Sequence, residues 1–428
     1  MRKFVRNTSR RLCLITVLIV MAVSSGCGDD TDVRYRDTEW VNVGGIVALS
    51  EASPVWGWSC LEALRCAEAD VNADPENQIA GKKVRLIYGD SGTDPDVANA
   101  LLESFINQGA RAVIGPLTSS ELLTMADTVN ASDSIVISPS STMSQLSVAG
   151  DNIFRMVPDD RLMIEAVVEA LSYKGIRHLA VMYIDDEWGA AIFEDLSRSF
   201  EEQGGTLLGS QNYLNLRPDI LQGALDDLSD LVSDQMTISD PSTIGFMIIC
   251  YDEGSGIIEL AASDPVLGAI RWFGTDGFVK SRSLPENETA ASFMVQTEYL
   301  APSLYVELTP EGEALKERIE TATGVPATHY SLLAYDAFRT AAEVLLNASS
   351  SITLDDLRRS LFSGLESDHY ATGNMALNEA GDRATGTYYF YTVEADDGSY
   401  AWQHVLTWED DRIAPAATAP LIAQDYPR

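Results

Sequence analysis

The sequence predicts an α/β protein built from two doubly wound lobes, each with a parallel sheet. Short β-branched runs alternate with helical segments from about residue 41 onward, and apolar residues in the helical segments recur at spacings of three and four. The alternation restarts near Phe154-Arg155-Met156-Val157-Pro158. Alternating strands and helices indicate parallel sheets with helices on both faces, and the restart indicates two lobes in this chain of 428 residues.

The individual elements follow from their apolar patterns. The expected strands are Val41–Leu49, Lys83–Gly89, Ala110–Ile114, Ile135–Ser138, His178–Tyr183, Thr206–Tyr213, Thr243–Cys250 and Ile270–Phe273. The expected helices are Trp58–Ala73, Asp96–Gln108, Glu121–Ala131, Asp160–Lys174, Glu187–Gln203, Pro218–Ser233 and Gly254–Ala262. The polar stretch Ser233–Ser242 is expected to be a mobile loop.

After residue 308 the pattern changes to a helical stretch followed by a hairpin. The helical segments are Pro310–Ala322 and Tyr330–Leu346, and the second carries a stripe of Leu and Ala residues at a spacing of four. The runs Thr387–Val393 and Ala401–Trp408 flank Asp397-Gly398, a dipeptide typical of tight turns. The sequence therefore predicts an antiparallel hairpin near the C-terminus.

The most informative feature for function is a pair of strands that end in hydroxyl residues. The first segment runs from Arg111 to Ser120 and the second from Ser134 to Thr142, and each passes abruptly from β-branched residues to Ser and Thr. In open parallel sheets, ligands bind outside the carboxyl ends of strands. A helix that begins at Ser119 or Ser120 would add its first-turn amides, which suit an anion such as a carboxylate.

The composition limits the classes of partner. The chain carries 29 basic and 64 acidic side chains, a formal net charge of −35, and its first 26 residues hold five of the basic ones and none of the acidic ones. The remainder therefore has 24 basic against 64 acidic side chains, a net charge of −40, which repels nucleic acid and anionic lipid headgroups. High external salt would account for such a surface, but a mesophilic protein can also carry it.

Residues 1–26 are predicted to be an export signal. Five basic residues precede the apolar run Leu12–Val23, which is too short to span a bilayer stably. Ser24-Ser25-Gly26-Cys27 resembles a bacterial lipobox, which makes Cys27 the predicted lipidation site, although Ser24 stands where that motif prefers Leu or Val. A plain secretory signal is the alternative. Arg10-Arg11 also resembles a twin-arginine signal, and residues 27–40 are predicted to form a tether.

No metal, cofactor or catalytic site is expected. Besides Cys13 in the signal and Cys27, the chain holds Cys60, Cys66 and Cys250, which are predicted to be buried thiols without a disulfide. The four histidines are scattered and lack metal-ligand spacing. Because the chain also lacks a nucleophile elbow, a dinucleotide-binding glycine motif and a phosphate loop, we do not expect an enzyme.

Six short motifs occur in a characteristic order between about Val41 and Trp408. They are Ser53-Pro54-Val55-Trp56-Gly57-Trp58, Gly89-Asp90-Ser91-Gly92-Thr93-Asp94-Pro95, Ile114–Ser120, Ile137–Thr142, Phe273-Gly274-Thr275-Asp276-Gly277 and Tyr335-Asp336-Ala337. Together they resemble the type I periplasmic binding proteins, specifically the leucine/isoleucine/valine-binding group of ABC-transporter receptors. No single motif is specific to that family, but their order and spacing are.

The resemblance implies two lobes joined by three hinge crossovers, with a solute clamped in the cleft between them. The crossovers would fall near Pro158, near Pro302 and near Asn378–Gly386. The first lobe would then comprise residues 41–157 and 302–380, and the second lobe residues 158–301 and 381–428.

The resemblance also implies roles for polar residues. Ser119 matches a serine whose hydroxyl and amide hold the ligand carboxylate, and Ser141 and Thr142 match a loop that offers a carbonyl and a hydroxyl. Asp276 matches an acid that binds the ligand ammonium through charge-assisted hydrogen bonds. The structural alternatives are that Ser119 or Ser120 only caps a helix and that Asp276 only forms a turn.

Three aromatic residues complete the implied ligand site. Trp58 matches an aromatic wall at the mouth of the cleft, and Trp188 matches an aromatic residue of the second lobe that covers the ligand. Tyr251 (or the adjacent Asp252) ends an expected strand and should face the cleft. The alternative for both tryptophans is a place in the core of a lobe.

The residues and the resemblance together predict an extracytoplasmic solute-binding lipoprotein that is a monomer and delivers a small molecule to an ABC permease in the membrane. Hydroxyls on one lobe and an acid on the other fit a zwitterion, so the expected ligand is an amino acid. One alternative is a receptor lipoprotein of the same fold that signals to a membrane partner. Another is a binder of an amide, urea or another non-amino-acid solute.

Overall fold

The computed structural model describes residues 39–50, 54–76, 81–214, 216–349, 351–366, 368–369, 371–396 and 398–416. The predicted signal peptide, Cys27 and the predicted tether up to residue 38 lie outside these ranges. All described residues belong to the unit formed by residues 38–428. Within the described ranges, no helix is both long enough and apolar enough to cross a membrane.

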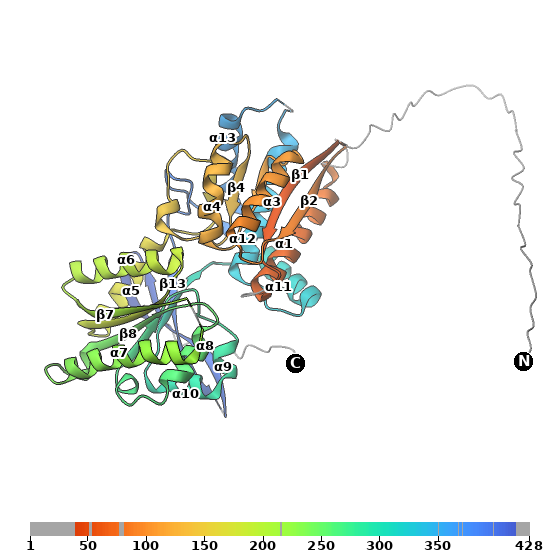
Figure 1. The fold of residues 1–428 in the computed structure, drawn as a ribbon. Coiled ribbons are helices and arrows are strands. Elements are labelled where there is room, and N and C mark those ends of the chain that lie inside the picture. The colour runs from red at the N-terminus through yellow and green to blue at the C-terminus, as the bar shows by residue number, and fades with distance from the viewer. Residues whose placement is uncertain are drawn as a thin grey trace, which may run out of the picture. The chain divides into compact units, whose positions relative to one another are not determined.

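The first lobe is built on a parallel sheet with the strand order β2-β1-β3-β4-β5. Its strands are β1 (Glu39–Val47), β2 (Lys82–Asp90), β3 (Ala112–Ile114), β4 (Ile135–Ser138) and β5 (Ile153–Arg155). Its helices are α1 (Pro54–Ala73), α3 (Pro95–Asn107), α4 (Ser119–Asn130), α11 (Pro310–Thr323), α12 (His329–Asn347) and α13 (Leu354–Leu365). A Cβ at Gly44 would meet Phe105 of α3 and one at Gly45 would meet Leu64 of α1, so helices cover both faces of β1 (Figure 1).

The second lobe repeats this architecture with the strand order β7-β6-β8-β9. Its strands are β6 (His178–Ile184), β7 (Thr206–Tyr213), β8 (Ile244–Ile249) and β9 (Arg271–Gly274). Its helices are α5 (Asp160–Tyr173), α6 (Glu187–Glu202), α7 (Pro218–Met236), α8 (Gly254–Ala261), α9 (Ser283–Glu286) and α10 (Glu288–Gln296). Short 3₁₀ turns occur at η1 (Ser144–Leu146), η2 (Pro241–Thr243) and η3 (Leu267–Ala269). The predicted pair of doubly wound parallel sheets is confirmed.

An antiparallel sheet continues the second lobe. It has the order β10-β13-β14-β15, with β10 (Ala301–Tyr305), β13 (Thr387–Asp396), β14 (Ser399–Glu409) and β15 (Arg412–Pro415). A bridge between Phe273 and Leu300 connects β9 to the residue before β10. β13 and β14 confirm the hairpin predicted from the sequence. A two-stranded ribbon of β11 (Asp368–His369) and β12 (Gly373–Asn374) lies outside these sheets.

Three expected boundaries differ from the structure. Glu39 and Trp40 already belong to β1, so the tether does not extend to residue 40. The expected second crossover at Pro302 lies within β10, whose partner is β13. Asp382 bridges to Arg155 at the edge of the first sheet, beyond the expected end of the first lobe at 380. The pairing partners are 43 to 227 residues apart in the chain, and a local pattern does not reveal such pairs.

Two helical regions were not expected. α13 and α10 lie in stretches that the apolar pattern leaves unassigned, because neither carries a long run of Leu, Ile and Val. The segment Ser233–Ser242, expected to be a loop, contains the last turn of α7 and the short η2. These differences leave the order of the elements around the strand ends unchanged.

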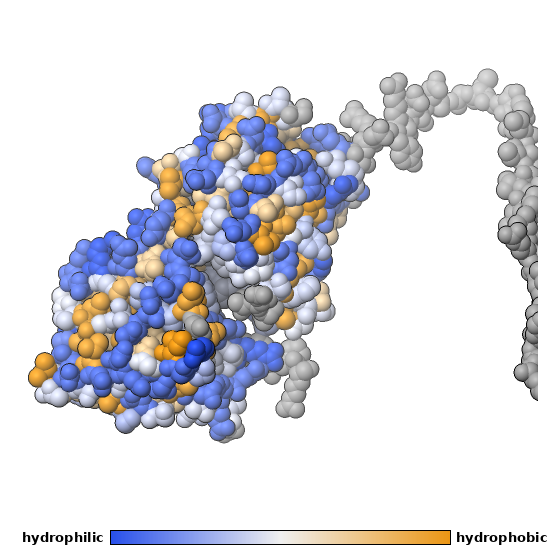
Figure 2. All heavy atoms as spheres, viewed as in Figure 1, coloured by the Kyte–Doolittle hydropathy of each residue, from blue (hydrophilic) through white to orange (hydrophobic). Residues whose placement is uncertain are grey.

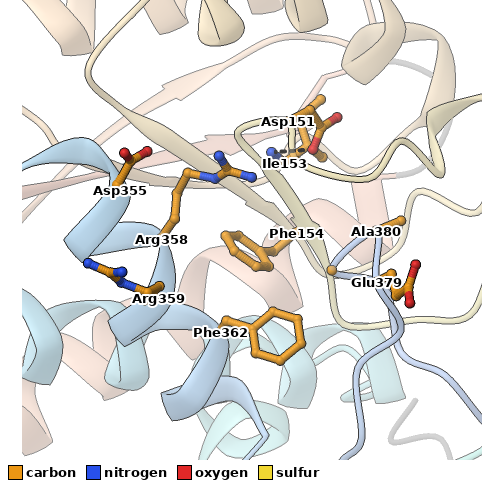
Figure 3. A pocket seen from close by; sticks show the side chains of 11 residues that line it. Asp151, Ile153, Phe154, Asp355, Arg358, Arg359, Phe362, Glu379 and Ala380 are labelled. Atoms are coloured by element: carbon orange, nitrogen blue, oxygen red, sulfur yellow. Dashed lines mark hydrogen bonds between the residues drawn. The ribbon is translucent and has the colours of Figure 1, made fainter.

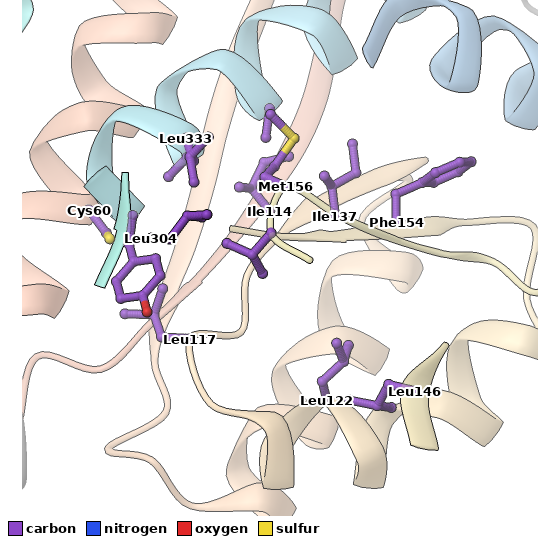
Figure 4. Packing of buried hydrophobic residues seen from close by; sticks show 14 of the residues in the cluster. Cys60, Ile114, Leu117, Leu122, Ile137, Leu146, Phe154, Met156, Leu304 and Leu333 are labelled. Atoms are coloured by element: carbon purple, nitrogen blue, oxygen red, sulfur yellow. The ribbon is translucent and has the colours of Figure 1, made fainter. Parts of the chain in front are cut away.

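Apolar side chains from both lobes form the core. Figure 4 shows Ile114 and Ile137 on adjacent strands, with Met156 and Leu333 of α12 close to them. Truncating such fully buried residues to alanine typically costs about 2–5 kcal/mol. The face of the molecule seen in Figure 2 is mostly hydrophilic, in keeping with the acidic composition. The packed core provides the rigid base on which the loops after β3 and β4 stand.

Candidate functional site

The two strands that end in hydroxyl residues lie side by side. β3 and β4 are adjacent and parallel, with Ile114 paired to Ile137, so the loops that follow them leave the same edge of the sheet. α4 connects the strands and begins at Ser119. The β-α-β unit predicted from the sequence is confirmed, and its free ends point to the carboxyl side of the sheet.

Ser119 is not the N-cap of α4. Thr118 holds that position, and its side chain forms a reciprocal capping box with the side chain of Glu121. The hydroxyl oxygen of Ser119 instead accepts hydrogen bonds from the backbone amides of Thr142 (3.1 Å) and Met143 (3.2 Å). Ser119 therefore joins the two loops, and neither of these bonds uses its own hydroxyl proton.

Ser141 fastens the second loop to the first. Its buried hydroxyl donates to the carbonyl of Thr118 at 3.1 Å and lies 2.8 Å from the hydroxyl of Ser138. The carbonyl of Thr142 accepts a hydrogen bond from the amide of Asp160 at 2.7 Å. The side chain of Ser141 is thus engaged within the protein, while Thr142 links the loop to the start of α5.

A fully buried ion pair is bonded to the loop that follows β4. The Nε and Nη2 atoms of Arg155 donate to the two carboxylate oxygens of Asp382 at 2.6 and 2.8 Å. The Nη1 atom of Arg155 donates to the carbonyls of Ser141 (3.3 Å) and Met143 (2.8 Å). Bidentate pairing fixes the guanidinium plane, so Arg155 fixes the position of the loop carbonyls as well.

On the second lobe, Trp188 and Tyr251 stack. Their ring centroids are 4.7 Å apart, and the hydroxyl of Tyr251 donates to Asp186 at 3.4 Å. A Cβ at Gly277 would lie 2.7 Å from the Trp188 ring, which shows that this ring packs against the backbone beside Asp276. Trp188 is almost fully buried, so it contributes to the core as well as to this aromatic wall.

Asp276 is hydrogen-bonded to an element of the first lobe. The hydroxyl of Tyr330, on α12, donates to its Oδ2 atom at 3.3 Å. Its Oδ1 atom is buried and has no hydrogen-bond partner among the described residues. Burial raises the pKa of Asp276 to about 6, and the bond from Tyr330 opposes that rise. Keeping this carboxylate ionised is therefore costly when no cation accompanies it.

Asp160 is a second acid of the site, and the motif comparison did not identify it. The residue is 1 % exposed, and neither carboxylate oxygen has a well-formed hydrogen bond to a described residue. Burial raises its pKa well above the ordinary value, and the charge of Asp276 raises it further. The Thr142 side chain lies close enough to lower this pKa. Two adjacent carboxylates without a counterion thus stand next to the hydroxyl loops.

The structure brings the predicted site residues together in two neighbouring sets, and one predicted residue lies apart from both. Ser119, Ser141 and Thr142 form the first set. Trp188, Tyr251 and Asp276 form the second, and Asp160 lies between the sets because it bonds to Thr142 and interacts with Asp276. Trp58 is 44 % exposed, and no contact among the described residues connects it to either set.

Trp56, two residues before Trp58 on α1, contacts the second set of residues through Tyr330. Its ring lies 5.4 Å from the ring of Tyr330, which in turn bonds to Asp276. Residues two apart on a helix point in nearly opposite directions, so only one of the two tryptophans of α1 can face Tyr330. The role of Trp58 at the mouth of the cleft therefore stays a prediction, and Trp56 is the tryptophan of α1 that contacts Tyr330.

The motifs did not identify Asp160, Tyr330 or Asp382, and the sequence carries a weak signal for the first two of them. Asp159 alone caps α5, so the second acid of the Asp159-Asp160 pair is not needed for capping. Tyr330 opens an expected helix, where a large aromatic residue has no capping function. Asp382 carries no local signal, because its partner is 227 residues away.

A separate cavity of about 340 Å³ lies at the amino end of β5 (Figure 3). Phe154 and Phe362 form its apolar floor, and charged side chains such as Asp151, Arg358 and Glu379 surround them. Since β5 is parallel to β3 and β4, this cavity is at the opposite edge of the sheet from the hydroxyl loops. It is therefore distinct from the site formed by Ser119, Asp276 and their neighbours.

Metal binding and disulfide chemistry have no visible basis in the described part of the chain. No group of three or more His, Cys, Asp or Glu residues there is placed to hold a metal ion. Cys60, Cys66 and Cys250 are buried with free thiols, as predicted. Burial raises the pKa of Cys60 to about 12, so its thiol is unreactive at neutral pH.

Comparison with known proteins agrees with this architecture. The family model described as periplasmic binding protein matches residues 41–399. An uncharacterized protein of Methanocaldococcus jannaschii, MJ1266, is 24% identical over 390 residues, covering 86% of this chain and 89% of that protein. The leucine-specific-binding protein of Salmonella typhimurium is 23% identical over 390 residues, covering 90% of this chain and 97% of its own.

A solved structure shares the fold at lower identity. The ABC transporter substrate-binding protein from Sphaerobacter thermophilus aligns with a TM-score of 0.69 at 19% identity, over 87% of this chain and 98% of that one. The arrangement of strands and helices is that of type I periplasmic binding proteins, and the predicted resemblance to the leucine/isoleucine/valine-binding group is confirmed. The chain belongs to the periplasmic binding protein family.

Proposed function

We propose that this protein is the extracytoplasmic solute-binding component of an ABC transporter and that its ligand is an amino acid. One observation carries the choice of ligand. Two carboxylates, the buried Asp160 and the half-buried Asp276, form no ion pair among the described residues and stand beside loops that offer hydroxyl and amide donors. The names of related proteins, a leucine-specific-binding protein and an ABC transporter substrate-binding protein, support the same class.

The donor loops would hold the ligand carboxylate. The capping box uses the amide of Glu121, but the amides of Ser119 and Ser120 in the same turn have no intrahelical acceptors and lie at the positive end of the helix dipole. The hydroxyl proton of Ser119 and the side chain of Thr142 add donors at the same sheet edge. Arg155 contributes indirectly, because it holds the carbonyls of Ser141 and Met143 in place.

The acids would hold the ligand ammonium. The charge of Asp276 raises the pKa of Asp160, burial raises the pKa of both acids, and an ammonium between them would oppose these shifts. Charge-assisted hydrogen bonds are about twice as strong as neutral ones, and the ligand would satisfy oxygens that now lack partners. The stacked rings of Trp188 and Tyr251 and the pair Trp56 and Tyr330 would enclose the rest of the molecule.

Export, anchoring and delivery form the second part of the proposal. Residues 1–26 would direct export, Cys27 would carry the lipid, and hinge bending at the crossovers would close the lobes on the ligand. The protein would act as a monomer and release its ligand to the permease without chemical conversion. These points rest on the N-terminal sequence and on the family membership.

The ligand is tested by thermal-shift screening of the purified mature protein. We expect at least one L-amino acid to raise the melting temperature, since a ligand at 100 times its Kd adds about 2.7 kcal/mol of stability. Asp276→Asn should weaken that amino acid by at least about tenfold, and Asp133→Asn, which alters an exposed acid, should not. Stabilisation only by amides, urea or other solutes without an ammonium would disprove the amino-acid ligand.

Delivery is tested by uptake. Cells that lack the gene should lose high-affinity uptake of the amino acid found in the screen, and the intact gene should restore uptake. The Cys27→Ser variant should restore less, because it lacks the lipid site. If binding is tight but deletion leaves uptake unchanged, transport is wrong and ligand sensing is favoured.

A further inference from the structure

Three basic side chains lie near the tyrosines around Asp276: His329 packs on Tyr330, Lys280 lies over Tyr391, and Arg383 is close enough to Tyr388 for its charge to act on it. Lys280 follows β9, His329 opens α12, and Arg383 lies just before β13. None of them takes part in an ion pair among the described residues. Their association is electrostatic as well as topological, since the charges of Lys280 and Arg383 both lower the pKa of His329.

The donors of this basic set are largely unused. The Nη1 atom of Arg383 and the Nε2 atom of His329 are buried, and neither has a hydrogen-bond partner among the described residues. The Nε atom of Arg383 reaches only the carbonyl of Thr385, at 3.1 Å. The ammonium of Lys280 lies 4.3 Å from the centre of the Tyr391 ring. A buried donor without an acceptor is costly, so the arrangement favours an acceptor from outside the protein.

Lys280 also has an unusual backbone. Its φ of +60° places it in the left-handed region, which is uncommon for residues other than Gly, Asn and Asp. Such a conformation costs of the order of 1 kcal/mol and persists only when its surroundings enforce it. The fold therefore holds the Lys280 side chain in a direction that a relaxed backbone would not choose.

Two tyrosines lie near both the basic set and the acid pair. Tyr330 bonds to Asp276, and its ring lies 3.9 Å from the ring of His329. The pKa of Tyr388 is raised by the charges of Asp276 and Asp160 and lowered by that of Arg383, so Tyr388 is near both sets. The site is consequently polar at two ends, with acids at one and bases at the other.

We propose that Lys280, His329 and Arg383 form an anion subsite for the side chain of the ligand, which makes the preferred ligand an amino acid with an acidic side chain. This inference rests on the proposed amino-acid function. The main-chain carboxylate would occupy the hydroxyl loops and the ammonium the acid pair, which leaves the basic set for a second carboxylate.

Two features fit a carboxylate at this position. His329 is the first residue of α12, whose N-terminus favours negative charge. Burial and the neighbouring cations lower the pKa of His329 to about 3, so at neutral pH its ring is uncharged and its Nε2 atom can carry a proton to donate. A ligand with an apolar side chain would leave the Nη1 atom of Arg383 and the Nε2 atom of His329 without acceptors.

The test is isothermal titration of the full mature protein with four probes: L-glutamate, L-aspartate, L-glutamine and L-leucine. L-glutamine has the shape of L-glutamate but lacks the charge. We expect the acidic probes to bind at least about tenfold more tightly than the neutral ones. A neutral side chain cannot form the hydrogen-bonded charge pair with the basic set, and the loss of such a pair lowers affinity by more than about tenfold.

Variants then locate the effect. Arg383→Gln and Lys280→Gln should each weaken L-glutamate by about tenfold or more while changing any L-glutamine binding less than about threefold. Arg359→Gln, on the exposed face of α13, is the matched control and should change neither. Lys280→Gln is the decisive variant if Arg383→Gln does not fold.

The outcomes separate this inference from the function on which it rests. If L-leucine or L-glutamine binds more tightly than the acidic probes, or if the variants weaken all probes equally, the anion subsite is wrong and the amino-acid function stands. If no amino acid binds at all, both are wrong.

Discussion

Arg155 and Asp382 form a bidentate ion pair with no exposure to solvent, although 227 residues separate them in the chain. The pair joins the end of β5 to the segment that leads into β13. The same guanidinium binds the carbonyls of Ser141 and Met143, which lie in the second hydroxyl loop. One buried side chain thus connects the end of β5 and the segment before β13 to the candidate ligand site.

Arg155→Met should destabilise the protein strongly. The substitution leaves the carboxylate of Asp382 buried without a partner, and breaking such a pair typically costs about 3–5 kcal/mol. Chemical denaturation measures the loss. The double variant Arg155→Met/Asp382→Leu should recover part of it, because it removes the unpaired charge.

The control for this prediction is Arg359→Met. Arg359 pairs with Asp356 on the surface of α13, with 76% and 51% of the two side chains exposed. Exposed pairs contribute about 0–1 kcal/mol, so this variant should be nearly as stable as the natural protein. Equal losses for both arginines would contradict the assigned role of the buried pair.

Ser119→Ala should weaken ligand binding more than stability. The variant removes the acceptor for the amides of Thr142 and Met143 and the donor proposed for the ligand carboxylate. Two unmade hydrogen bonds predict a stability loss of about 1–3 kcal/mol, and a lost charge-assisted bond predicts about a tenfold or greater loss of affinity. Ser120→Ala, at the next position of α4, is the matched control. If it weakens binding as much as Ser119→Ala does, Ser119 has no special role.

The stability of the ligand-free protein should depend on pH through Asp276. Its folded pKa of about 6 exceeds the ordinary value of 3.8, so the folded protein retains a proton that the unfolded chain has lost. This contribution is favourable below pH 4, declines between about pH 4 and 6, and is absent above pH 6. Melting temperatures at pH 5 and pH 7.5 measure it.

The variant comparison isolates that contribution from the rest of this acidic protein. Asp276→Asn should raise the melting temperature at pH 7.5 and reduce the difference between the two pH values, because the amide does not ionise. Asp133→Asn, at an exposed acid, should leave the difference as in the natural protein. An unchanged pH difference in Asp276→Asn would contradict the raised pKa.

Tyr330→Phe should move the pH dependence of amino-acid binding. The hydrogen bond from Tyr330 lowers the pKa of Asp276, so its loss raises that pKa further. Binding of the ammonium requires the ionised carboxylate, and the pH at which affinity falls to half should therefore move upward. Tyr335→Phe, one turn along α12 and bonded to Asp70 instead, should leave the midpoint where it is. A midpoint that falls or does not move in Tyr330→Phe would show that Tyr330 does not control Asp276.

The ordered motifs predicted which residues lie together where each residue follows directly from its own strand. Ser119, Thr142 and Asp276 each stand one loop beyond a parallel strand, and parallel strands bring such loops to one edge. The motifs do not determine the direction in which a side chain on a helix points. Trp56 and Trp58 occupy one helix turn, and only the packing of α1 determines that Trp56 faces Tyr330.

The sequence by itself determined the alternation of strands and helices, the two-lobed fold class and the hydroxyl loops, because each arises from contacts between residues close in the chain. Only the tertiary structure revealed the Arg155–Asp382 pair, the second acid Asp160 and the basic set of Lys280, His329 and Arg383. These groups come from segments as much as 227 residues apart. Their burial, their unpaired atoms and their effects on one another arise only when the folded chain removes water from around them.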